Sequence, residues 1–176
     1  QVVWCPAAFL SLGIGQGASF KMAERYRRGT RVSLGTDAAR DGTPGENMLA
    51  AHHVSQTYGE PLSPEALLEM QTISGAAAAG MGAELGSLEP GKRADVVVRS
   101  ARVAEAYPAN NPVHRLALTM GTGSVDTVVV NGQVVLSGGH STRVDESEVY
   151  RTVSDSVVAR AERLGIAAGP EWPIVS

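Results

Sequence analysis

The chain has 176 residues, a formal net charge of −3 and 43% hydrophobic residues, which suits one or two globular domains with a real core. This mild acidity gives no reason to expect nucleic acid or an anionic membrane as partner, and no run of 18 apolar residues predicts a membrane span. The single cysteine, Cys5, excludes an internal disulfide and fits a reducing, cytoplasmic location. Because the chain opens at Gln1 on a Val-rich stretch, we expect that an earlier part of a longer chain is absent.

The first third of the chain has the pattern of an α/β protein. A strand is predicted over residues 2–4, a loop follows Cys5 and Pro6, and helical spacing of apolar residues predicts a helix over 18–28 that ends at Gly29. A second strand follows at 32–36. This strand–helix–strand order predicts a βαβ unit, which requires a parallel pair with helices outside.

Three helices are expected next. The first runs from Pro44 or Gly45 to about Thr57. The second starts at Ser63-Pro64-Glu65, where Ser serves as N-cap, Pro takes the first helical position and an acid lies in the first turn. Thr72 is expected to cap the third, an alanine-rich helix.

The remainder reads as an antiparallel β unit followed by a helix. A turn at 89–92, a strand at 94–98, a short helix near 113–120 and two Val-rich strands at 125–130 and 133–138 are predicted. Asn131-Gly132 between the last two strands indicates a type I′ hairpin. These strands are too few to bury both faces alone. Finally, apolar residues at every fourth position predict an amphipathic helix over 144–164 that ends at Gly165: Val149, Val153, Val157 and Ala161.

Three stretches together resemble one known family. They are SLGTD at 33–37, LGSLEPGKRADVVV at 85–98 and VDTVVVNGQVVLSGG at 125–139. In motif, order and spacing the chain is similar to the C-terminal part of the amidohydrolase superfamily, in the cytosine-deaminase-like and chlorohydrolase branch. The second stretch is highly specific, whereas SLGTD alone is weak.

The resemblance implies an α/β fold: the C-terminal part of a (β/α)8 TIM barrel, part of a small β-sandwich domain and a C-terminal helix. Residues 1–84 would supply barrel strands seven and eight with their helices, 85–139 the C-terminal part of the sandwich, and 140–176 the C-terminal helix and tail. In the family the sandwich is built from both chain ends. The apolar stripe of the 144–164 helix more often means docking on its own barrel than a partner site.

Asp37, at the end of the second strand, is the candidate site residue. From spacing alone, an aspartate that caps a turn through backbone amides is the more frequent case. The resemblance instead implies a metal ligand at the C-terminal mouth of the barrel, where barrel enzymes place their catalytic residues. It also implies one divalent metal, zinc first with iron as the alternative, and most ligands would be histidines on strands outside this chain. A metal-activated water would attack a small-molecule substrate, and Asp37 would be the catalytic proton shuttle for C–N hydrolysis, most directly deamination of a heterocyclic amine.

Other polar residues have ordinary explanations. The four histidines are interpreted as packing or surface residues: His52, His53, His114 and His140. On the loop after Asp37, four residues could touch substrate, although a solvated loop is the simpler reading: Arg40, Asp41, Glu46 and Asn47. Gly91 to Asp95 lacks the phosphate-loop pattern and is taken as a structural turn of the sandwich that Asp95 or Arg93 fixes by local bonds.

Trp4 and Cys5 lie where many relatives have His-Cys-Pro, and Ala8-Phe9 replaces a Ser-Asn pair of the substrate pocket. This departure suggests either a more apolar pocket floor or simple core packing at a strand end. Cys5 has no base nearby in sequence, which argues against a nucleophilic role.

A second hypothesis belongs to another class. The chain would be a non-catalytic fragment, or one part of a split enzyme that requires an N-terminal partner chain, because the expected His-x-His pair is missing. An amidase or imidazolonepropionase-like ring hydrolase is a further possibility that shares the metal chemistry. A homo-oligomer is also open.

Overall fold

A βαβ unit forms the N-terminal part of the computed structural model, which describes residues 1–13, 21–37, 44–108 and 110–166. Strands β1 (Val2–Trp4) and β2 (Val32–Leu34) pair in parallel, with Val2 opposite Val32, and α2 (Met22–Arg27) lies between them in sequence. The predicted parallel pair is therefore confirmed. A further helix, α1 (Pro6–Ser11), replaces the expected loop, because Pro6 at its first position and the alanines after it favour helix.

Four helices follow: α3 (Pro44–Thr57), α4 (Pro64–Gln71), α5 (Ile73–Ala78) and α6 (Pro112–Leu118). The start of α4 is as predicted, since the Ser63 Oγ accepts a hydrogen bond from the Ala66 amide at 3.2 Å. The expected Thr72 cap is wrong in detail, because its hydroxyl donates to the Leu68 carbonyl of α4 instead. The helices bury their apolar faces against β1 and β2 in one core, which includes Trp4, Val32, Leu67 and Met70.

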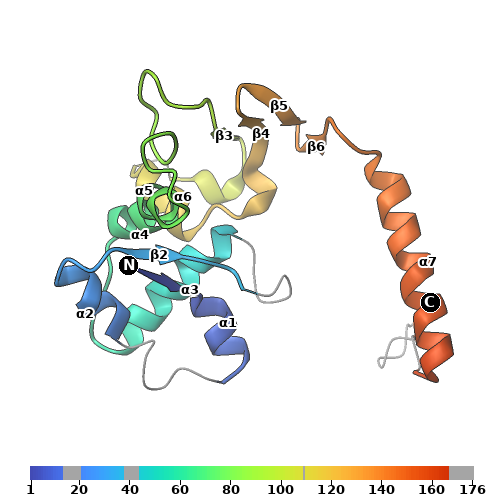
Figure 1. The fold of residues 1–176 in the computed structure, drawn as a ribbon, viewed down its shortest axis with the longest axis horizontal. Coiled ribbons are helices and arrows are strands. Elements are labelled where there is room, and N and C mark those ends of the chain that lie inside the picture. Colours follow the sequence, from blue (N-terminus) through green and yellow to red (C-terminus); the bar gives the residue numbers. More distant parts are fainter. Residues whose placement is uncertain (14–20, 38–43, 109, 167–176) are drawn as a thin grey trace.

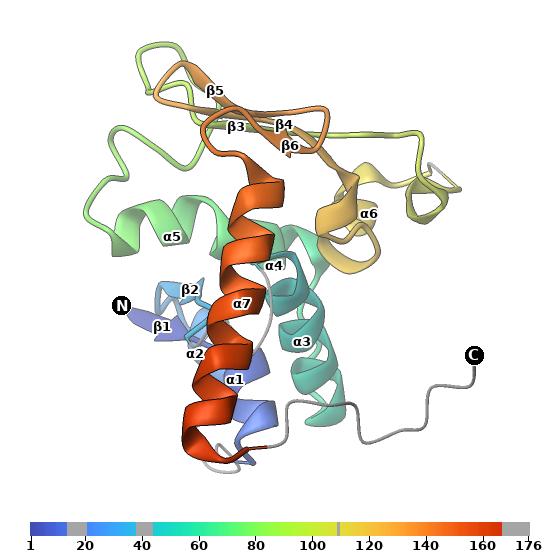
Figure 2. The same ribbon diagram turned by 90° about the vertical axis from the view of Figure 1, so that its right-hand side faces the viewer.

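The second sheet is antiparallel, in the order β3 (Val96–Arg99), β4 (Val125–Val130), β5 (Gln133–Ser137) and β6 (His140–Ser141). Figure 1 and Figure 2 show this sheet as a separate layer above α4, α5 and α6. Asn131 and Gly132 both have positive φ, at 49° and 77°, which confirms the predicted hairpin turn. Sequence reasoning missed β6, because two residues are too short a run to show a strand period.

The LEPGKRAD stretch joins the helices to this sheet. The Lys92 ammonium donates to the Gly82 and Leu85 carbonyls at 3.1 and 3.3 Å and to the Ser87 hydroxyl at 2.7 Å. The Asp95 carboxylate accepts from the Asn131 amide at 2.6 Å, so it fixes the distant hairpin turn. The expectation of a purely local bond for Asp95 is therefore wrong: the sheet brings the two turns together.

Helix α7 (Glu146–Leu164) ends the described chain, at a left-handed Gly165 as predicted. None of its residues is buried, and Figure 1 shows it descending from the β6 end of the sheet, apart from the helices around β1 and β2. The expected docking of its apolar stripe on the chain's own helices is therefore not seen in the described residues. No helix within the described ranges combines the length and apolarity needed to cross a membrane.

Candidate metal-binding and catalytic site

Asp37 follows a fully buried strand. All three residues of β2 are buried, whereas Asp37, three positions past Leu34, is exposed. Its φ is +59°, a backbone conformation that non-glycine residues seldom adopt and that costs energy at this point of the chain. The carboxyl ends of parallel strands lie at one edge of a sheet, so this carboxylate lies at the edge where α/β proteins bind ligands.

Cys5 lies at the same edge, directly after β1. The Gly35 amide donates to the Trp4 carbonyl at 2.9 Å, which continues the strand pairing to this point. A Cβ added at Gly35 would lie 2.9 Å from Val3 Cγ1 and 3.1 Å from the Cys5 sulfur. A larger residue at position 35 would therefore have to push the Val3 and Cys5 side chains aside, which glycine avoids where the two strand ends meet.

The thiol of Cys5 is a poor nucleophile in this setting. Burial raises its pKa above the ordinary value, the negative charge of Asp37 raises it further, and a hydrogen bond with the Asp37 backbone partly offsets both. Sequence reasoning did not pair Cys5 with Asp37, although the βαβ pattern contained the signal, because adjacent parallel strands end side by side.

Trp4 belongs to the core. Its side chain is 0% exposed and packs in the cluster that holds Met22, Val32 and Leu34. Of the two interpretations, core packing at a strand end is the one that the described residues support.

The four histidines do not gather around Asp37 in a metal cluster. Among the residues that the structure describes, no group of three or more His, Cys, Asp or Glu side chains is placed to hold a metal ion. His52 and His53 are neighbours on α3 with ring centroids 6.0 Å apart, and His140 contacts Glu146 at the start of α7. The role of Asp37 as ligand and proton shuttle therefore stays a prediction.

The residues expected on the loop after Asp37 divide into two groups. Arg40 and Asp41 lie outside the described residues. Glu46 and Asn47 lie in the first turn of α3, and Asn47 is 1% exposed. For Asn47 the solvated-loop interpretation is wrong, because the helix turns its side chain into the protein.

A large cavity lies elsewhere in the molecule. It has a volume of about 970 Å³ between the second sheet and the helical layer, and it is lined by apolar side chains such as Leu68, Val96, Leu116 and Met120. Neither Asp37 nor Cys5 lines it. The cavity therefore does not extend the candidate site at the strand ends.

One family model and several known proteins match most of this chain. The model of the amidohydrolase family matches residues 11–135. The chain is 33% identical over 158 residues to a 5-methylthioadenosine/S-adenosylhomocysteine deaminase of Caldanaerobacter subterraneus, covering 86% of this chain and 36% of that protein. It is 28% identical to an S-triazine hydrolase of Gordonia rubripertincta, covering 94% of this chain and 36% of that protein.

Solved structures agree on the fold. An adenosine deaminase from Xanthomonas campestris with bound zinc superposes with a TM-score of 0.76 at 23% identity, covering 92% of this chain and 36% of that one. The chain thus spans about a third of the length of the proteins that it matches.

Proposed function

Because this chain belongs to the amidohydrolase family, we propose that it is the C-terminal portion of a metal-dependent hydrolase that cleaves a non-peptide carbon–nitrogen bond. The observation that carries the proposal is the placement of Asp37, an exposed carboxylate at the carboxyl end of a buried parallel strand. Deamination of a small heterocyclic amine is the reaction we propose, in keeping with the named activity of the Caldanaerobacter relative.

Asp37 fits one position of a divalent-metal site. Carboxylate oxygens are ordinary zinc ligands, and an exposed carboxylate at a strand end is open to an incoming ion. A bound divalent cation supplies a water made acidic enough to act as nucleophile near neutral pH. The Asp37 carboxylate would help to hold the cation, and it would accept a proton and deliver it to the leaving amine. The remaining ligands belong to the proposed barrel strands outside this chain.

The finer architecture is part of the same proposal. Residues 1–84 would complete a (β/α)8 barrel and residues 85–139 a β-sandwich, both with the part of the enzyme that the relatives have and this chain lacks. We propose zinc as the metal, with iron as the alternative, since the Xanthomonas structure holds zinc. A cytoplasmic location fits the free Cys5.

The test is intact mass together with metal content, measured on the enzyme that contains this chain. We expect a mass well above 18.3 kDa and about one equivalent of zinc or iron. Asp37→Asn should weaken metal binding by at least the roughly 10–100-fold that loss of an outer-shell partner costs. Asp126→Asn is the matched control, because Asp126 is an exposed aspartate on β4 of the second sheet. Equal metal content in both variants would contradict the proposed role of Asp37.

The second candidate function is a non-catalytic fragment or one part of a split enzyme. Its motivation is that the 176 residues contain no His-x-His pair. The coding sequence upstream of Gln1 discriminates between the two. An in-frame extension with a His-x-His pair supports the single-chain enzyme, whereas a start codon at Gln1 supports complementation by a separate N-terminal chain.

A further inference from the structure

Helix α7 carries an apolar face that the described chain leaves uncovered. This face, called here the α7 apolar face, consists of Val149, Val153 and Val157, which are 43%, 56% and 59% exposed. Their spacing of four places them on one side of the helix. Most helical stability in proteins comes from packing such an apolar face against other parts of the structure.

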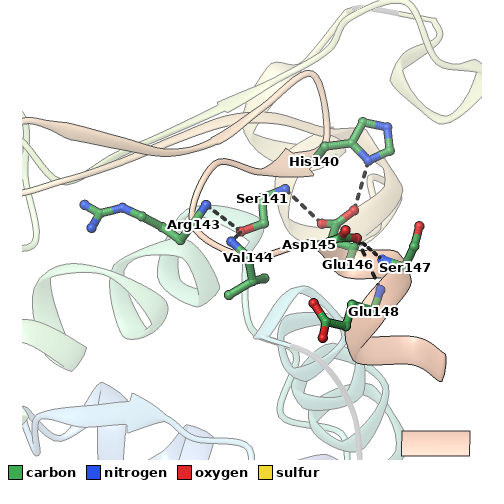
Figure 3. Close-up of polar contacts among 8 residues, drawn as sticks. All are labelled: His140, Ser141, Arg143, Val144, Asp145, Glu146, Ser147 and Glu148. Carbon is green, nitrogen blue, oxygen red and sulfur yellow. Dashed lines mark hydrogen bonds and ion pairs between the residues drawn. The ribbon is translucent and has the colours of Figure 1, made fainter. Parts of the chain in front are cut away.

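The first turn of α7 is nevertheless firmly joined to the second sheet. Figure 3 shows the Glu146 carboxylate between His140 Nδ1, at 3.0 Å, and the Ser141 amide, which donates to it at 2.8 Å. These bonds hold the pKa of Glu146 below its ordinary value. Both partners lie on β6, so one side chain links the helix to a strand.

Further bonds stiffen the short connection, residues 142–145. The Ser141 hydroxyl accepts from the Arg143 amide at 3.1 Å and the Val144 amide at 3.3 Å, while Asp145 caps the Ser147 and Glu148 amides (Figure 3). Thr142 donates through its amide to Val135 and through its hydroxyl to Val134, both on β5. The direction of α7 is therefore set by polar contacts at its base, without packing along its length.

The structural comparison shows how much of a longer protein is available to lie against the helix. The Xanthomonas match covers 92% of this chain, a share too large to leave out residues 146–176, so part of α7 lies within the superposed region. That match takes up only 36% of the longer structure. The detached position of α7 is thus compatible with a complete enzyme, in which the other part of the protein is available to fill the space beside it.

We propose that α7 is a preset arm: Glu146 positions it from the sheet, and the α7 apolar face docks on the portion of the enzyme that this chain lacks relative to its relatives. This inference rests on the proposed function, which requires such a portion. Presetting matters because a helix already held in direction loses less conformational freedom on docking than a loose one. Glu146 is accordingly a positioning residue.

Hydrogen exchange of α7 tests the docking. We expect the amides of residues 150–161 to exchange at least 100-fold more slowly in the complete enzyme, as a single chain or a complemented complex, than in the 176-residue chain. A metal-loaded, active enzyme with unprotected α7 amides would overturn the inference and leave the proposed function intact. An enzyme without metal or activity but with protected amides would overturn the function alone. Protection that appears in the 176-residue chain with rising concentration would assign the face to a second copy and overturn the inference.

A pair of variants locates the docking face. Val153→Asp places a charge within the α7 apolar face, whereas Ala159→Asp places the same charge about 120° further around the helix, outside that face. The control is the stricter of the two, because replacing alanine costs more helix propensity than replacing valine. We expect Val153→Asp to remove the protection in the complete enzyme and Ala159→Asp to preserve it. The same loss in both variants would contradict docking through this face.

The positioning role of Glu146 has its own readout. Spin labels on Ser137→Cys and Ser156→Cys, in a Cys5→Ser background, report the distance from β5 to α7. Glu146→Ala should at least double the width of the distance distribution, with helix content unchanged. Glu148→Ala, in the same turn, is the control. Glu148 takes part in the joint through its backbone amide, which alanine keeps, so the width should stay unchanged. Equal broadening in both variants would refute the role of Glu146.

Discussion

Gly86, in the LGSLEPGK stretch after α5, lies against the first turn of that helix, and replacing Gly86 with alanine is a sharp test of this packing. Its φ is +95°, and an added Cβ would meet Ala76 Cβ at 2.9 Å, Ile73 Cα at 3.0 Å and the Thr72 carbonyl at 3.2 Å. Two of these three atoms are backbone, so the neighbouring helix would have to shift.

The matched control is Gly91→Ala, a few residues further along the same stretch. Gly91 has nearly the same φ, +92°, but nothing lies within 4 Å of its added Cβ. Both variants incur the left-handed backbone cost of roughly 1–2 kcal/mol, offset by roughly 0.4–1 kcal/mol from a more restricted unfolded chain. Only Gly86→Ala adds overpacking, worth about 1–3 kcal/mol.

The free energy of unfolding, measured in urea by tryptophan fluorescence, to which the buried Trp4 contributes, should thus fall by about 1 kcal/mol in Gly91→Ala. It should fall by about 2–4 kcal/mol in Gly86→Ala. Equal losses in the two variants would refute the close approach of Gly86 to α5 and leave backbone strain as the whole effect.

Two further predictions concern α4 and the strand-end site. Ser63→Ala removes the cap of α4 and should lower the free energy of unfolding by about 1 kcal/mol. Thr72→Ala should lower it less, because the Thr72 hydroxyl caps no helix. A larger loss in Thr72→Ala than in Ser63→Ala, measured by urea unfolding, would contradict the cap assignment. Iodoacetamide should alkylate Cys5 at pH 8 more slowly than a free thiol, because its raised pKa lowers the thiolate fraction. Asp37→Asn removes one cause of that rise and should speed the reaction, with burial still holding it below the free rate; a slower reaction would show that the Asp37 charge does not act on Cys5.

Local signals in the chain were enough for most of the elements. Asn131-Gly132 requires positive φ at two successive residues, and Ser63-Pro64 supplies a cap and a preset first turn, so both features depend on neighbours in sequence. The loop predicted after Cys5 was wrong, because no apolar period in the sequence marks the short helix that forms there. A six-residue helix such as α1 is too short to show a period, and its buried Pro6 and Ala8 are stabilised by the surrounding structure.

The sequence by itself therefore determined the order of strands and helices, the parallel pair, the hairpin and the position of Asp37 at a strand end, because these follow from spacing and turn chemistry. Only the tertiary structure decided that Cys5 meets Asp37 across two strand ends, that Asp95 fixes a hairpin 36 residues away, and that α7 projects uncovered from a polar joint at Glu146. Each of these depends on residues distant in sequence that sheet pairing brings together, and no local pattern records that pairing.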